Sequence, residues 1–131
     1  MQSPHIFPLR VYYEDTDLAG IVYYANYLKF IERARSEWVR SLGIDQAQLK
    51  AEAGLVFAVR HLTANYLIPA KFDDVLTIST QVLEAKGARM VLDQRVLRGG
   101  VLLFDAKVTL VAIGANGAAA RLPQTLRAAL A

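Results

Sequence analysis

The spacing of hydrophobic residues changes along the chain from the period of a helix to that of a strand. Between about residue 24 and residue 42, apolar side chains recur every three or four residues, as they do on one face of a helix. These positions are Tyr27, Phe30, Ile31, Ala34, Trp38, Val39 and Leu42. Because Gly43 follows directly and glycine commonly ends helices, the pattern predicts one long amphipathic helix of about five turns.

Shorter elements are expected on both sides of this helix. Residues 6–13 are typical of a strand, in which Pro8 favours an edge position, and residues 14–23 form a loop. Beyond the long helix, Asp45 can cap a second, short helix that ends at Gly54.

Four further strands follow, at residues 55–66, 75–85, 88–98 and 101–113. Turn-forming pairs, Lys86-Gly87 and Gly99-Gly100, separate the last three strands and predict hairpins. Pro123 can start a short helix over residues 124–130. This order predicts an α+β fold, in which the long helix lies on one face of an antiparallel sheet. One helix cannot cover the whole sheet, so the remaining surface and edges favour association with a second subunit.

Length and composition narrow the function classes. The chain has 131 residues, of which 54% are hydrophobic, so residues 1–131 are expected to form a single domain. No apolar run is long enough to span a membrane, and the first residues lack the pattern of a signal peptide. The absence of cysteine excludes disulfides and thiolate nucleophiles, and a cytoplasmic location is the simplest interpretation. Basic residues are scattered among acidic ones, which argues against nucleic-acid binding despite the net charge of +3.

The loop before the long helix carries the candidate chemistry. Its sequence, YEDTDLAGIVYYANY at 13–27, places carboxylates and Gly20 beside a helix start. Backbone N–H groups at a helix start can stabilise an oxyanion, and a nearby carboxylate can attack a carbonyl or activate water. The alternative is that Asp15 and Asp17 only cap the loop and interact with the helix dipole.

The segment YYEDTDLAGIVYYANYLKFIERAR resembles the signature of hotdog-fold acyl-CoA thioesterases. Within that family it is most similar to the tol-pal-associated (YbgC-type) group, which is related to 4-hydroxybenzoyl-CoA thioesterase. The resemblance extends from residue 6 to about 125 and includes NYLIPAKFDDVLTI at 65–78. It implies a five-stranded antiparallel sheet wrapped around one central helix. It also implies hydrolysis of acyl-CoA, or of acyl carrier protein thioesters, to a free acid and a thiol.

The resemblance also implies roles for individual residues. Asp17 corresponds to the family's catalytic carboxylate, acting as nucleophile or general base, and the backbone N–H of Tyr24 to its oxyanion donor. Many tol-pal-type relatives have histidine where this chain has Tyr24, so a histidine-assisted proton transfer is not implied. The expected substrate-binding residues are Gly20, Ile21, Val22, Asn26, Lys86 and Arg89, the last two through CoA phosphates.

No cofactor is implied, and a metal site is not expected, because His5 and His61 have no ligand-like spacing. The resemblance implies a homodimer or a homotetramer. It also implies a cytoplasmic location, which in some relatives is close to the inner membrane. The rival interpretation is a non-catalytic hotdog adaptor that binds acyl carrier or envelope partners. Turnover of an acyl-CoA panel distinguishes the two.

Overall fold

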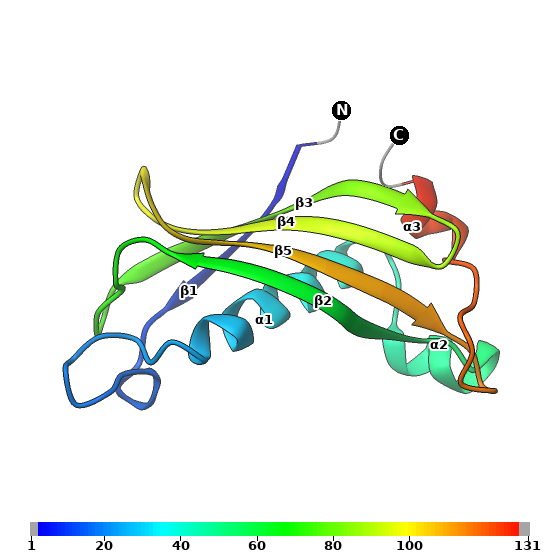
Figure 1. Cartoon of the computed structure of the whole chain (residues 1–131), viewed down its shortest axis with the longest axis horizontal. Coiled ribbons are helices and arrows are strands. Elements are labelled where there is room, and N and C mark those ends of the chain that lie inside the picture. Colours follow the sequence, from blue (N-terminus) through cyan, green and yellow to red (C-terminus); the bar gives the residue numbers. More distant parts are fainter. Residues whose placement is uncertain (1–2, 129–131) are drawn as a thin grey trace.

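The computed structural model describes residues 3–128 and contains one five-stranded antiparallel sheet (Figure 1). Its strands are β1 (His5–Arg10), β2 (Val56–Tyr66), β3 (Val75–Lys86), β4 (Arg89–Arg98) and β5 (Val101–Ile113). The helices are the 3-10 turn η1 (Tyr13–Asp15), α1 (Asn26–Ser41), α2 (Gln46–Ala53) and α3 (Gln124–Ala128). The order across the sheet is β1-β3-β4-β5-β2, so the predicted α+β class and the edge position of the strand with Pro8 are confirmed.

The helix α1 lies on the concave side of the curved sheet, which is the expected hotdog arrangement (Figure 1). Six of the seven predicted apolar positions on α1 are buried, and Leu42 is partly buried. The short helix is also as predicted, because the Asp45 carboxylate accepts hydrogen bonds from Ala47 N and Gln48 N at 3.0 and 3.1 Å. Gly54 ends that helix with a φ of 65°.

Two element boundaries differ from the expectation by two residues or more. The first strand ends at Arg10, because Asp15 Oδ2 accepts a hydrogen bond from Tyr12 N at 2.8 Å and draws the chain into η1. The long helix begins at Asn26, two residues after the expected start near Tyr24. Of the expected C-terminal helix, residues 124–128 form α3 and residues 129–130 lie outside the described part of the chain.

The face of the sheet that points toward α1, called the inner face here, is apolar but only partly covered. The helix lies closest to β3, β1 and β4, and it approaches β5 and β2 less closely. The inner-face residues of β2 are therefore only partly buried or are exposed: Phe57, Val59, Leu62, Ala64 and Tyr66. Since β2 is also an edge strand, apolar side chains and unpaired backbone groups occur together along it.

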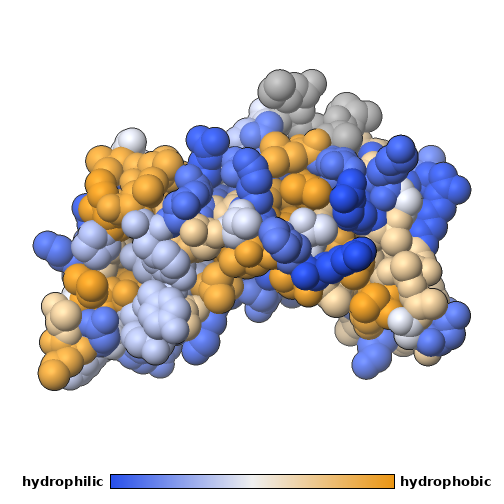
Figure 2. Space-filling view, in the orientation of Figure 1, coloured by the Kyte–Doolittle hydropathy of each residue, from blue (hydrophilic) through white to orange (hydrophobic). Residues whose placement is uncertain are grey.

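The opposite, outer face of the sheet is polar in its middle. Neighbouring strands there contribute Asn65 Nδ2, which donates to Asp105 Oδ1 at 2.8 Å, and Arg95, which pairs with Asp93 at 3.0 Å. On the side of the arch that Figure 2 shows, apolar clusters reach the surface between hydrophilic ones. Exposed large apolar side chains of the sheet occur on β2, at Val56, Val59 and Tyr66, and also on other strands, at Ile6, Val75, Leu83 and Val101.

One buried polar group connects α1 to the middle of the sheet. The Gln94 side chain, fully buried on β4, donates hydrogen bonds to Ile31 O and Thr80 Oγ1, both at 2.9 Å. Its Oε1 accepts a hydrogen bond from Arg35 at 3.0 Å. All of these bonds hold one turn of α1 above one position of the sheet.

Replacing this amide should lower the stability of the protein. We expect Gln94→Ala to reduce the free energy of unfolding by about 2 kcal/mol, because it removes two buried hydrogen bonds and leaves a cavity. Urea unfolding at one protein concentration measures the change. Gln124→Ala, an exposed change of the same kind on α3, should leave the unfolding midpoint nearly unchanged. Equal midpoints for Gln94→Ala and wild type would contradict this role.

Candidate active site

Asp17 lies in a tight turn between β1 and α1. Gly20 N donates to Asp17 O at 3.0 Å, and Gly20 has a φ of 80°, which glycine adopts without strain. Asp17 N donates to Ile21 O at 2.9 Å, and its Oδ1 accepts a hydrogen bond from Ala19 N at 2.9 Å. The Asp17 carboxylate is exposed, so most of its acceptor capacity is open to solvent or to a ligand.

Asp15, two residues earlier, is buried and satisfied by the chain itself. Its side chain accepts from Tyr12 N, and its carbonyl oxygen accepts from Tyr23 N and from Asn26 Nδ2, both at 2.9 Å. Capping of the loop therefore describes Asp15 fully, whereas Asp17 caps the turn only through Ala19 N and is otherwise exposed. The Asn26 amide ties the first turn of α1 to the loop, and its substrate-binding role stays a prediction.

The helix α1 begins without a side-chain cap. Ala25 occupies the N-cap position, and its methyl group cannot accept a hydrogen bond from the first backbone N–H groups of the helix. Within residues 3–128, the backbone N–H groups of Tyr24 and Ala25 have no acceptor. The Tyr24 side chain is 62% exposed. The loop therefore presents an exposed carboxylate and two unbonded N–H donors at the positive end of a helix.

A groove of about 290 Å³ opens beside these donors. Its lining is almost entirely apolar or aromatic: Ile21, Val22, Tyr24, Tyr27, Tyr66, Leu67, Ile68 and Pro69. Sequence reasoning placed the first three beside the site but missed the others. Tyr27 was predicted only as an apolar position of the long helix, and the only signal for the other four was the segment at 65–78, which carried the family resemblance without any assigned role.

The loop after β2, residues 67–74, supports the Gly20–Val22 segment. Val22 N donates to Ala70 O at 2.8 Å, and Ile21 forms a β-bridge with Lys71. Ala70 N in turn donates to the phenol oxygen of the buried Tyr27 at 2.9 Å. Burial raises the pKa of Tyr27, so its phenol stays protonated and neutral at physiological pH.

An ion pair fixes the far end of this loop. Asp74 Oδ2 accepts hydrogen bonds from Lys71 N and from the Arg98 guanidinium, both at 2.8 Å. Burial alone raises the pKa of Asp74, but these two bonds outweigh it and hold the pKa below its usual value. The Asp74 carboxylate therefore has a structural role, because it ties this loop to β4 through Arg98.

Lys86 and Arg89 lie away from Asp17. Both are exposed at the β3–β4 hairpin, beside α3, whereas the Asp17 turn lies at the opposite end of the molecule (Figure 1). Arg89 pairs with Glu84 on the same hairpin. The 16-residue α1, which spans about 24 Å, runs between these two ends. One protomer therefore does not bring these basic residues to Asp17.

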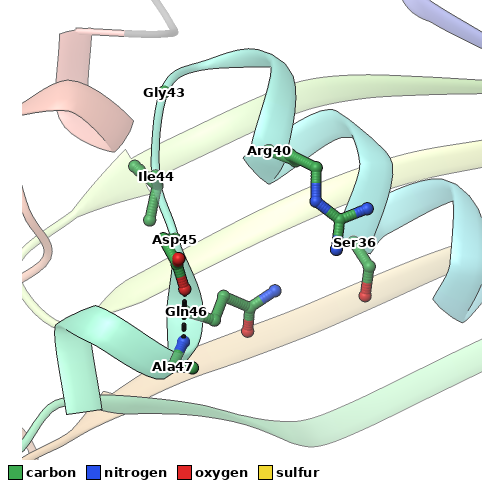
Figure 3. Close-up of a pocket in the computed structure, with 7 residues that line it drawn as sticks. All are labelled: Ser36, Arg40, Gly43, Ile44, Asp45, Gln46 and Ala47. Carbon is green, nitrogen blue, oxygen red and sulfur yellow. Dashed lines mark hydrogen bonds between the residues drawn. The ribbon is translucent and has the colours of Figure 1, made fainter. Parts of the chain in front are cut away.

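A larger cavity, of about 460 Å³, lies at the C-terminal end of α1 (Figure 3). Its lining residues are Ser36, Arg40, Gly43, Ile44, Asp45, Gln46 and Ala47. In Figure 3 the Asp45 carboxylate points to Ala47 N, so it caps α2. This cavity is remote from Asp17 and is not part of the candidate site.

The two histidines are far apart, since His5 lies on β1 and His61 on β2, the opposite edges of the sheet. Residues 3–128 contain no group of three or more His, Asp or Glu side chains that could hold a metal ion. Over the same range, no helix has the length and hydrophobicity needed to cross a membrane.

Comparison with known proteins gives consistent matches. A model of the thioesterase superfamily matches residues 19–104. The chain is 46% identical to an acyl-CoA thioesterase YbgC of Haemophilus influenzae, over 82% of this chain and 79% of that protein. It is 43% identical to an acyl-CoA thioester hydrolase YbgC of Escherichia coli, over 82% and 80%. The structure of a probable thioesterase from Bartonella henselae has a TM-score of 0.88 and 41% identity, over 92% and 100%.

We expect the Asp74–Arg98 pair to make stability depend on acid pH. The folded pKa of Asp74 lies below its unfolded value of about 3.9, so the pair stabilises the fold fully above that value. This contribution is lost as pH falls through the lower, folded-state pKa. In urea unfolding, wild type should be more stable than Asp74→Asn at pH 7, and the gap should close in acid.

Asp73→Asn is the matched control. Asp73 forms an exposed ion pair with Arg10, and asparagine tolerates its φ of 70°. This variant should differ little from wild type at either pH. A gap for Asp74→Asn that persists unchanged in acid would show that the carboxylate charge is not its source.

Proposed function

Because this chain belongs to the thioesterase superfamily, we propose that the Asp17 carboxylate and the backbone N–H of Tyr24 form its hydrolytic site. The reaction is the hydrolysis of acyl-CoA to a free acid and the CoA thiol. One observation carries the assignment of the site: an exposed carboxylate and unbonded backbone donors occur together at the start of α1.

The substrate carbonyl oxygen docks on the Tyr24 N–H, with the Ala25 N–H beside it. These donors and the positive end of α1 stabilise the negative charge that develops on that oxygen. Asp17 then acts by one of two routes. It attacks the carbonyl carbon and expels the thiolate, leaving an acyl–aspartyl anhydride that water hydrolyses, or it removes a proton from the water that attacks. A thiolate leaves readily, so neither route needs a strong general acid.

The acyl group lies in the apolar groove beside Tyr24. Its lining, which includes Tyr27, Tyr66 and Ile68, offers almost no polar partner beyond backbone groups and phenols. Such a surface suits a hydrocarbon or aryl acyl group better than a charged one. Acyl carrier protein is the alternative carrier of the same thioester.

The active unit is a homodimer joined through β2, with a homotetramer as a larger assembly. The 11-residue edge strand presents unpaired backbone groups and partly exposed apolar side chains on its inner face. Antiparallel pairing of two copies of β2 about a two-fold axis gives these backbone groups hydrogen-bond partners and buries the apolar side chains. The enzyme then works in the cytoplasm, where protein partners bring it near the inner membrane.

Such a dimer also gives Lys86 and Arg89 a role. The two-fold axis reverses the second protomer, so that its β3–β4 hairpin comes to the end of the dimer where the first protomer holds Asp17. The partner's basic residues can then contact the CoA phosphates.

The site assignment predicts a large loss of activity for Asp17→Asn. Losing the nucleophile or general base should lower kcat by at least about a hundredfold, while circular dichroism shows an intact fold. Asp15→Asn should lower kcat much less, because the Asp15 carboxylate faces Tyr12 N inside the loop. Assays with an acyl-CoA panel measure both. Similar rates for Asp17→Asn and wild type would refute the assignment.

Subunit mixing tests the shared site. One protomer carries Asp17→Asn and the other carries both Lys86→Ala and Arg89→Ala. Each variant chain has a different affinity tag, so that the heterodimer of the two can be purified. If the basic residues act across the interface, one of the two sites of this heterodimer combines an intact Asp17 from one protomer with intact Lys86 and Arg89 from the other. The heterodimer should then recover about half of the wild-type activity.

If the basic residues act within one protomer, or only in folding, neither site of the heterodimer is complete. Activity should then stay near half that of the Lys86→Ala/Arg89→Ala homodimer. An acyl-pantetheine substrate, which lacks the nucleotide phosphates, is the control. The double variant should raise KM for acyl-CoA and leave that for acyl-pantetheine unchanged.

A further inference from the structure

Tyr66 makes a hydrogen bond that links the end of the edge strand to the start of α1. Its hydroxyl donates to Tyr24 O at 2.9 Å, across 42 residues of sequence. Its ring stays in place independently of this bond, because it packs edge-on against Phe104 and Tyr27, at centroid distances of 5.0 and 5.5 Å. The hydroxyl and the ring can therefore be separated by mutation.

The peptide between Tyr24 and Ala25 has little other support. The helix ladder does not use the Tyr24 carbonyl, since Leu28 N donates to Ala25 O at 3.2 Å. Within residues 3–128, Tyr66 provides the one hydrogen bond that the Tyr24 carbonyl receives. The N–H of this same peptide is that of Ala25, which is unbonded within residues 3–128 and lies at the start of an uncapped helix.

We propose that Tyr66 is a positioning residue for hydrolysis, whose hydroxyl orients the Tyr24–Ala25 peptide toward the substrate carbonyl oxygen. The inference rests on the proposed function, and it places Tyr66 outside the reacting atoms. Without the hydroxyl, this peptide can rotate, and the N–H of Ala25, which belongs to it, loses its alignment. Burial raises the pKa of the Tyr66 phenol, so the hydroxyl keeps its proton and remains a donor at neutral pH.

Tyr66→Phe tests the inference, because it removes the hydroxyl and keeps the ring. We expect kcat to fall about five- to tenfold, as one hydrogen bond supports, with KM nearly unchanged. This fall in kcat should be equal for acyl-CoA and acyl-pantetheine, because the effect arises at the thioester carbonyl that both substrates share. The Kd for an S-alkyl-CoA thioether, which has no carbonyl, should stay within about twofold of wild type.

Tyr23→Phe is the matched control and should keep wild-type kinetics. Its ring lies 4.9 Å from that of Tyr24, and its hydroxyl has no hydrogen-bond partner within residues 3–128. Wild-type kcat for Tyr66→Phe, or a change in KM alone, would overturn the inference. If Asp17→Asn is inactive in the same assay, that failure concerns Tyr66 only. An active Asp17→Asn overturns the proposed site and the inference together.

Discussion

The position of α1 over the sheet depends on one buried amide. Apolar packing is not directional, so the apolar stripe of α1 alone could slide along the apolar inner face. The Gln94 side chain prevents this by donating to Ile31 O in the middle of the helix and to Thr80 on the neighbouring strand. Moving the helix would break the bonds of the buried Gln94 amide to Ile31 O and from Arg35, which is costly even though its bond to Thr80 remains. The start of α1, and with it the candidate site, is therefore fixed from the core.

The same placement explains why the site and the uncovered surface lie on one side. Because α1 lies nearest β3, β1 and β4, the inner face of β2 stays partly open. Tyr66, the last residue of that strand, lines the groove and also contacts the backbone of Tyr24. A second copy that covered β2 would therefore extend to this groove. Incomplete coverage by one helix thus leaves the groove open and the inner face of β2 partly exposed.

Periodic features could be predicted from the sequence, whereas contacts between distant segments could not. The helix face from Tyr27 to Val39 and the cap at Asp45 follow from local spacing and local hydrogen bonds. The contact between Tyr66 and Tyr24 spans 42 residues and depends on the order of the strands, which local pattern does not specify. Likewise, the separation of Lys86 from Asp17 depends on which ends of the sheet the β3–β4 hairpin and the loop between β1 and α1 occupy (Figure 1).

The two carboxylates of the loop illustrate how environment, rather than residue type, assigns a role. Asp15 and Asp17 are chemically identical and lie two residues apart, so the sequence alone admits either one as catalyst or cap. Asp15 is buried, and its carboxylate accepts a hydrogen bond from Tyr12 N. Its carbonyl oxygen accepts two more, from Tyr23 N and Asn26 Nδ2, which hold the loop to the start of α1. A carboxylate held in this way cannot reach a substrate without dismantling the loop. Asp17 makes one short-range bond, to Ala19 N, and is otherwise exposed. The buried Asp15 therefore helps to build the loop that leaves the Asp17 carboxylate exposed.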